Sequence, residues 1–227
     1  LKKMKYKALD ADPCVFKNED ESLHIAIFVD DCIIGYEDHK TLENFMAELR
    51  KFFEVDDLGE LSKYLGMNIS FGSDGSITLS QKRHIEELLA KHSISPNPKV
   101  KTPLSPNVKL DAEARPVNVT QYKSMVGACL YLAVTSRPDI IYAACVLARY
   151  GIKPNEIHMK AVANLIKHAY NTRYFKIKCV CDDKVDSSIT VHAKDLALEA
   201  CGDASFGDNK SGKSTTGHVI LMNSGPR

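Results

Sequence analysis

The chain has 227 residues, of which 44% are hydrophobic and 26% are charged, and its formal net charge is +1. This composition is typical of one large or two small globular domains, and the nearly neutral total does not demand a polyanionic partner. No apolar run is long enough to span a membrane. The first residue is Leu1 rather than Met, which we expect of a piece of a longer protein. Cysteines such as Cys32, Cys129 and Cys145 lie in apolar segments, which predicts reduced, buried thiols in an intracellular protein.

Two adjacent carboxylates, Asp30 and Asp31, lie between two short apolar runs within residues 23–35. Runs of this length and composition predict the two strands of a β-hairpin, with the Asp pair at its tight turn. A carboxylate pair on such a rigid support is a candidate seat for Mg²⁺, which prefers oxygen ligands. The alternative is a plain turn, because Asp is a common turn residue and needs no metal there.

The next segment predicts an amphipathic helix over residues 41–53 that lies on the sheet of the hairpin, with Asp38 or Thr41 as its cap. A second hairpin follows, with strands over residues 67–71 and 76–79. The glycine-rich residues 72–75 between them read as its turn, since an Asp-Gly step favours hairpins.

Ser80 is predicted to cap a helix that ends near residue 91. Residues 94–120 then contain five prolines and few apolar residues, so we expect an extended linker and the main domain boundary there.

Beyond residue 120 the pattern predicts three helices and then strands. Thr120 is expected to cap the first helix, Pro138 to lie in the first turn of the second, and the third to span residues 156–170. Predicted strands follow at residues 174–181, 187–192, 198–205 and 216–222. This order predicts an α+β fold with two lobes.

Histidines and basic residues of this region each allow two interpretations. His84, His92, His158 and His168 are predicted to be solvated or hydrogen-bonded structural residues, because their spacing gives no shared metal-binding face. The basic side chains are expected either to follow a nucleic-acid backbone or to form an ordinary soluble surface. They are Lys99, Lys101, Lys109, Arg115, Lys123, Arg137, Arg149, Lys153, Lys160, Lys167 and Arg173.

An ordered set of short motifs resembles one family. The Phe28-Val29-Asp30-Asp31 segment resembles the palm motif of reverse transcriptases, and the rest resembles the copia-type LTR-retrotransposon Pol polyprotein. The similar segments are DLGEL at 57–61, YLGMNI at 64–69, LSQ at 79–81, TPL at 102–104, TSRPDI at 135–140, GDASF at 202–206 and KSTTG at 213–217. The resemblance extends in order over essentially the whole chain.

This resemblance implies a partial reverse-transcriptase palm and thumb lobe, then a helical connection and the first strands of an RNase H-like fold. Residues 1–93 are expected to form the C-terminal part of the palm and thumb, and residues 94–120 a proline-rich linker. Residues 121–195 would be the connection region. Residues 196–227 would be the N-terminal part of the RNase H-like domain.

The resemblance also implies RNA-directed DNA polymerase activity with RNase H, in which Mg²⁺ ions assist nucleotidyl transfer. By position, Asp30 would be the main metal ligand and Asp31 its weaker neighbour, with Phe28 and Val29 near the primer terminus. Asp203 would be the first carboxylate of the RNase H site. Because both sites need further carboxylates that we expect outside residues 1–227, this segment alone is expected to be inactive and to bind Mg²⁺ weakly.

The partners implied are an RNA or DNA template–primer, an RNA–DNA hybrid and deoxynucleoside triphosphates, with a homodimer as a further expectation and no membrane. The implied location is intracellular, in a cytoplasmic virus-like particle or the nucleus. Two alternatives stay open: a non-catalytic nucleic-acid-binding or dimerisation module, and a degenerate relic of the polymerase.

Overall fold

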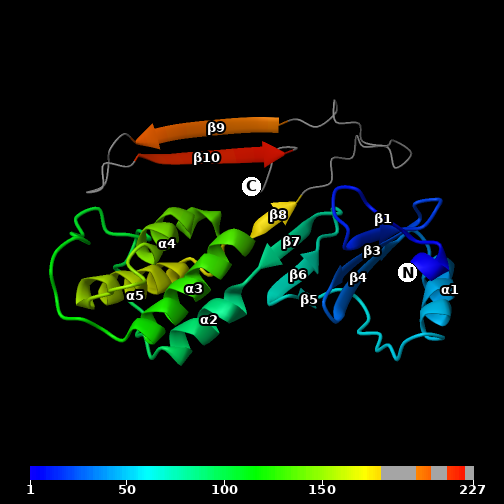
Figure 1. Ribbon diagram of the computed structural model, residues 1–227, viewed down its shortest axis with the longest axis horizontal. Coiled ribbons are helices and arrows are strands. Elements are labelled where there is room, and N and C mark those ends of the chain that lie inside the picture. The colour runs from blue at the N-terminus through cyan, green and yellow to red at the C-terminus, as the bar shows by residue number, and fades with distance from the viewer. Residues whose placement is uncertain (180–197, 206–213, 223–227) are drawn as a thin grey trace. The chain divides into compact units, whose positions relative to one another are not determined.

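The computed structural model describes residues 1–179, 198–205 and 214–222, and the chain divides into two compact units, Leu1–Leu61 and Ser62–Arg227 (Figure 1). Both units combine antiparallel strands with separate helices, which confirms the mixed α/β class expected from the sequence. Among the described residues, no helix has both the length and the apolar content needed to cross a membrane.

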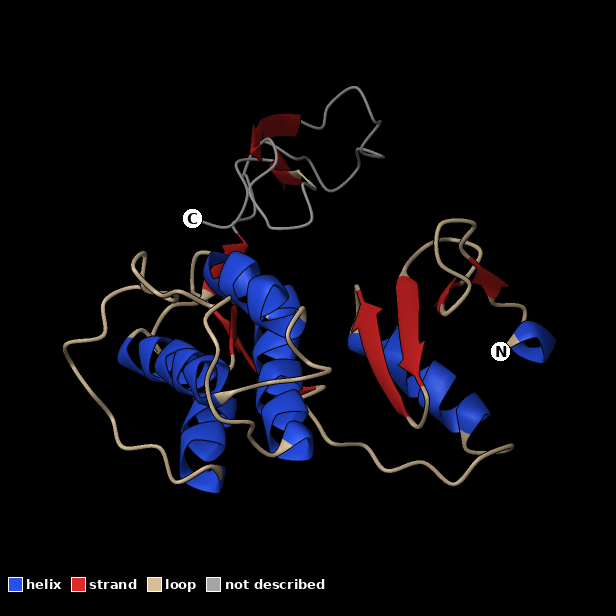
Figure 2. Ribbon diagram, turned by 60° about the vertical axis from the view of Figure 1, so that its left-hand side comes forward, coloured by secondary structure: helices blue, strands red, loops and turns tan. Residues whose placement is uncertain are grey.

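The first unit is a four-stranded antiparallel sheet in the order β1-β2-β3-β4 with one long helix against it (Figure 2). Its elements are η1 (Lys2–Met4), β1 (Lys7–Ala8), β2 (Val15–Lys17), β3 (Leu23–Phe28), β4 (Asp31–Tyr36) and α1 (His39–Leu49). Leu23 and Ile25 of β3 pack with Phe45 and Met46 of α1 to form its core. The predicted hairpin is therefore present.

Helix α1 begins two residues earlier and ends four residues earlier than expected. Asp38 is its N-cap, and its carboxylate accepts hydrogen bonds from the Thr41 amide at 3.0 Å and from the Thr41 hydroxyl at 2.6 Å. Of the two predicted caps, Asp38 is the correct one, because a carboxylate at this position satisfies an amide that lacks a partner in the helix.

The second unit joins another antiparallel sheet, in the order β5-β6-β7-β8, to a cluster of helices. Its strands are β5 (Lys63–Tyr64), β6 (Met67–Phe71), β7 (Ile77–Ser80) and β8 (Ile177–Cys179), and its helices are α2 (Lys82–Lys91), α3 (Val119–Thr135), η2 (Pro138–Ile140), α4 (Ile141–Ala148) and α5 (Glu156–Asn171). The turn between β6 and β7 is confirmed, with Gly75 at φ 73°. Strand β8 begins at Ile177, three residues after the start of the strand predicted over residues 174–181.

Strands β9 (Leu198–Ser205) and β10 (Thr215–Met222) form a separate antiparallel hairpin in which all eight residues of each strand are paired. Their bounds agree with the predicted strands at residues 198–205 and 216–222. The strand predicted at residues 187–192 lies outside the described residues.

Residues 94–120 do not separate two units, contrary to our expectation. Ile85 and Leu88 of α2 are buried in the same core as Tyr122, Leu147 and Leu165 of the later helices, and Leu104 and Leu110 of the proline-rich segment pack against that core. The division lies instead between Leu61 and Ser62. The proline content correctly predicted an irregular backbone but not its position along the surface of one helical core.

Smaller expectations about the caps and the thiols were met in part. Asn118, not Thr120, caps α3 by accepting from the Gln121 amide. Gln81 occupies the N-cap position of α2 without a side-chain cap bond, while the predicted Ser80 hydroxyl accepts from the Lys82 amide at 3.3 Å. Of the three thiols expected to be buried, only Cys129 is, because Cys32 lies beside the hairpin tip and Cys145 on the outer side of α4.

Candidate functional site

The tip of the β3–β4 hairpin is a two-residue turn made by Val29 and Asp30. The last cross-strand pair before the turn is Phe28 opposite Asp31. All four side chains are exposed, with Phe28 at 54% and Val29 at 81%. The four residues that the family resemblance assigns to the polymerase site therefore lie at one exposed hairpin tip.

Val29 has a φ of 54°, in the left-handed region. A β-branched residue is strained there, because its branched Cβ approaches the backbone carbonyl. Tight two-residue hairpins need a positive φ at the first central position, which Gly, Asn or Asp adopts more readily. The hairpin tip thus holds Val29 in a left-handed conformation that valine disfavours.

The two faces of this hairpin differ in what covers them. Leu23 and Ile25 are 0% and 1% exposed and point into the core formed with α1. Because side chains alternate along a strand, Phe28 and its partner Asp31 lie on the opposite face. Gly35, on that same face of β4, has no atom within 4 Å of the position a Cβ would take. Asp31 therefore stands on an open sheet surface.

Asp31 also affects its neighbour electrostatically. Partial burial and the negative charge of Asp31 together raise the pKa of the Cys32 thiol above its usual value. The charge of Asp31 therefore acts on the Cys32 thiol beside it in β4.

Asp30 and Asp31 offer the hard oxygen donors that Mg²⁺ prefers, so their chemistry fits this ion. Across residues 1–179, 198–205 and 214–222, however, no three His, Cys, Asp or Glu side chains gather closely enough to hold a metal ion. The hairpin thus presents two neighbouring carboxylates that belong to no group of three or more ligands among the described residues.

The predicted RNase H residue Asp203 lies in the middle of β9, opposite Gly217 of β10. Its side chain is exposed, and one carboxylate oxygen accepts a hydrogen bond from the Ala204 amide at 2.8 Å. Within the described part of the chain, Asp203 belongs to no group of three or more His, Cys, Asp or Glu side chains that could hold a metal ion.

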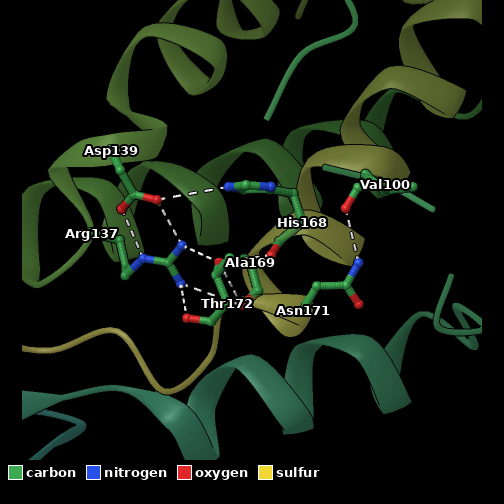
Figure 3. Close-up of polar contacts among 7 residues, drawn as sticks. All are labelled: Val100, Arg137, Asp139, His168, Ala169, Asn171 and Thr172. Atoms are coloured by element: carbon green, nitrogen blue, oxygen red, sulfur yellow. Dashed lines mark hydrogen bonds and ion pairs between the residues drawn. The ribbon is translucent and has the colours of Figure 1, made fainter. Parts of the chain in front are cut away.

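Arg137, within the TSRPDI segment, is a structural residue whose role the sequence did not reveal. It is 1% exposed and donates to both oxygens of Asp139, at 2.8 and 2.7 Å. Figure 3 shows the same guanidinium bonded to the Ala169 carbonyl, and to the Thr172 hydroxyl at 2.6 Å, at the end of α5. Arg137 is therefore not among the cations available to a nucleic-acid backbone.

Asp139 is held ionised by this arrangement. Burial alone would raise the pKa of Asp139, but the hydrogen bonds from Arg137 and the nearby His168 ring outweigh it and hold that pKa well below its usual range. The His168 Nε2 atom lies 3.8 Å from the carboxylate. The motif thus fastens the start of η2 to the end of α5.

His158 is likewise structural, which confirms the expectation of a hydrogen-bonded residue. Its Nδ1 accepts from the Asn155 amide at 3.0 Å, and its Nε2 lies 2.8 Å from the Leu110 carbonyl. The ring stacks on Tyr150 at 4.1 Å between centroids. A second tie joins the Asn171 amide to the Val100 carbonyl at 3.0 Å (Figure 3). These contacts fasten the proline-rich segment to α5.

The first part of the chain is similar to a known protein family. Residues 1–106 match the family model "Reverse transcriptase (RNA-dependent DNA polymerase)". No solved structure matches the chain.

Three curated relatives extend the similarity along the chain. The chain is 31% identical to the putative transposon Ty5-1 protein YCL074W of Saccharomyces cerevisiae over 91% of its length. It is 29% identical to the retrovirus-related Pol polyprotein from transposon TNT 1-94 of Nicotiana tabacum over 99%, and 30% identical to that from transposon RE1 of Arabidopsis thaliana over 90%. It spans 65% of the yeast protein and 17% and 13% of the two plant proteins. Together these matches support a fragment of a copia-type LTR-retrotransposon Pol polyprotein, whose residues 1–106 match the reverse-transcriptase family model.

Proposed function

We propose that this chain is a working part of a retrotransposon RNA-directed DNA polymerase. Residues 1–93 would supply the C-terminal part of the palm and thumb, and residues 121–195 the connection region. Residues 196–227 would begin the RNase H-like domain. The match of residues 1–106 to the reverse-transcriptase family supports the first of these assignments.

One observation carries the proposal: the Phe28–Asp31 pair closes a two-residue turn on an open sheet face. This arrangement leaves both carboxylates free of protein in front of the hairpin while the opposite face is fixed by α1. A primer terminus on that face would contact the exposed Phe28 and Val29 side chains.

Asp30 and Asp31 are the residues that would hold Mg²⁺, with Asp30 at the outermost position of the turn. When bound, the metal stabilises the attacking and leaving oxygens of nucleotidyl transfer. The rigid packing of β3 on α1 would keep the carboxylates in register with a primer end, since loosely held ligands lose catalytic geometry. With only two carboxylates in the group, this chain by itself is expected to bind Mg²⁺ weakly and to extend no primer.

Asp203 would act as the first RNase H carboxylate. Its place on an eight-residue strand, opposite a glycine that leaves room beside it, supports this role. Hydrolysis of an RNA–DNA hybrid would require further carboxylates around it.

The partners proposed with this function are a template–primer, deoxynucleoside triphosphates and an RNA–DNA hybrid, in an intracellular setting. A second candidate is a non-catalytic nucleic-acid-binding or dimerising module. The two-carboxylate group favours it for the chain alone, and β4 lies at an edge of its sheet, where a second chain can pair.

The test is Mg²⁺-dependent primer extension by the tobacco TNT 1-94 polyprotein carrying this chain in place of its matching region. Asp30→Asn is expected to abolish extension. The matched control is Asp20→Asn, because Asp20 is an exposed turn residue between β2 and β3, and extension should be unchanged. Equal extension by the Asp30→Asn variant and its parent would contradict the proposal.

A further inference from the structure

Two exposed aromatic rings follow α5 in the second unit. Tyr174 is 65% exposed and Phe175 is 57% exposed. Large rings left in solvent are costly, and those beside cations are typical of surfaces that stack on nucleic-acid bases. We infer that Tyr174 and Phe175, with Lys82 and Lys176, form a stacking platform for single-stranded nucleic acid.

The Tyr174 ring is held in place before any ligand arrives. Arg173 lies 4.7 Å from its centroid and donates to its hydroxyl at 3.3 Å. The same guanidinium lies 4.2 Å from the Tyr170 ring, donates to the Tyr170 carbonyl at 2.9 Å and pairs with Glu86 at 3.3 Å. Arg173 is therefore a positioning residue, since these contacts hold its guanidinium against the two tyrosine rings and Glu86.

Phe175 is held in a similar way. The buried Arg137 guanidinium lies 5.4 Å from its centroid. One side of the Phe175 ring thus rests on a fixed cation, while more than half of the side chain remains open to solvent. A rigid ring of this kind binds a base with little loss of side-chain freedom.

Lysines border the two rings. The Lys82 Nζ lies 4.9 Å from the Tyr174 centroid, and its ion pair with Glu86 is long, at 4.0 Å. Lys176 is exposed. Three cations contact the rings, Lys82, Arg137 and Arg173, and Lys176 follows Phe175 in the chain, against the two carboxylates that pair with them, Glu86 and Asp139. The local formal charge is therefore +2, while the whole chain carries +1.

This combination favours nucleic acid over a protein partner. Lysine is depleted at protein–protein interfaces, whereas cations beside exposed aromatic rings bind phosphates and bases together. Unpaired bases are required because bases inside a duplex have their faces covered. The inference deepens the proposed function and rests on it, because a polymerase must handle the single-stranded template.

The experiment measures fluorescence anisotropy of a labelled oligothymidylate with the full chain at several salt concentrations. Tyr174→Ala is expected to weaken binding at least about fivefold, and Tyr174→Phe, which keeps the ring, should bind like the wild type. The control is Tyr142→Ala, which removes a ring 59% exposed on the uncharged α4 and should leave binding unchanged.

Lys176→Gln should reduce the salt dependence of binding by about 0.7 in the log–log slope, and the exposed Lys153→Gln should not. Wild-type-like binding by Tyr174→Ala, or no binding by the wild type, would overturn the platform. A change in self-association without a change in oligonucleotide binding would assign the patch to a protein interface and also overturn it. If Tyr174→Ala changes neither binding to the oligonucleotide nor to an RNA–DNA hybrid, the platform fails while the proposed polymerase role stands.

Discussion

Arg137 donates to both carboxylate oxygens of Asp139 from a position that is almost fully buried. The two residues are two positions apart in the chain. The same Arg137 guanidinium also donates to carbonyls at the end of α5, more than thirty residues later. The geometry of this short segment thus depends on a distant helix terminus within the second unit.

Asp139→Asn is expected to lower the free energy of unfolding by roughly 2 kcal/mol at pH 7, because Arg137 would lose its charged partner. Solvent on the exposed side of Asp139 screens the pair, so the loss should be smaller than for a fully buried pair. The matched control is Arg83→Gln, which breaks the exposed pair with Glu87 and should cost at most about 0.5 kcal/mol.

The same pair predicts a pH dependence. Because the folded pKa of Asp139 is lowered, its stabilisation is present above the unfolded pKa, about 3.9, and is lost as the pH falls through the folded pKa. Urea unfolding should therefore show the wild type and Asp139→Asn converging below about pH 4. A difference that stays constant between pH 7 and pH 2 would contradict this.

His158→Ala should loosen the proline-rich segment by removing the contacts to Asn155, Leu110 and Tyr150. Loss of a helix cap costs about 1 kcal/mol, and the segment loses a tie to α5 as well. Limited trypsin digestion should then cleave faster after Lys109. The exposed His24→Ala in the first unit serves as control, and equal cleavage of both variants would show that His158 does not hold the segment.

Val29→Asn should stabilise the first unit by about 1 kcal/mol, because asparagine adopts a positive φ more readily than a β-branched residue. The side chain is 81% exposed, so little burial is lost. Val134→Asn, at a 73% exposed helical position, should change stability by no more than about 0.5 kcal/mol. Thermal unfolding measures both, and a destabilised Val29→Asn variant would show that the turn is not strained.

Asp31→Asn should speed alkylation of Cys32, because the negative charge of Asp31 contributes to its raised thiol pKa. The rate at the exposed Cys145 should not change, and Cys129, whose pKa burial raises to about 12, should stay unlabelled until the chain unfolds. Mass spectrometry of the labelled peptides reads out all three thiols. An unchanged Cys32 rate would mean that Asp31 does not act on it.

Local features of this chain were predictable, and contacts between distant segments were not. The hairpin around Asp30, the Asp38 cap and the Gly75 turn follow from residues within a few positions of one another. The pairing of β8 with β7 joins residues about a hundred positions apart, and no short pattern encodes it.

The roles of the proline-rich segment and of Arg137 also could not be predicted from nearby residues. Proline content predicts irregular backbone whether a segment separates two domains or lies along one core. A lone arginine in a sequence resembles a phosphate contact, and only the folded position of Thr172 and Asp139 reveals a structural role. By contrast, the position of the Asp30–Asp31 pair at a hairpin turn was predictable because the turn and both of its strands lie in one short segment.

The most direct test of the central claim, that the β3–β4 turn is a metal-binding turn, is paramagnetic broadening of amide signals by Mn²⁺. Signals of residues 29–32 should weaken first as Mn²⁺ is added to the wild-type chain, and Asp30→Asn should remove this preference while Asp20→Asn keeps it. Broadening that is no stronger at residues 29–32 than around Asp20, or that survives Asp30→Asn unchanged, would contradict the account.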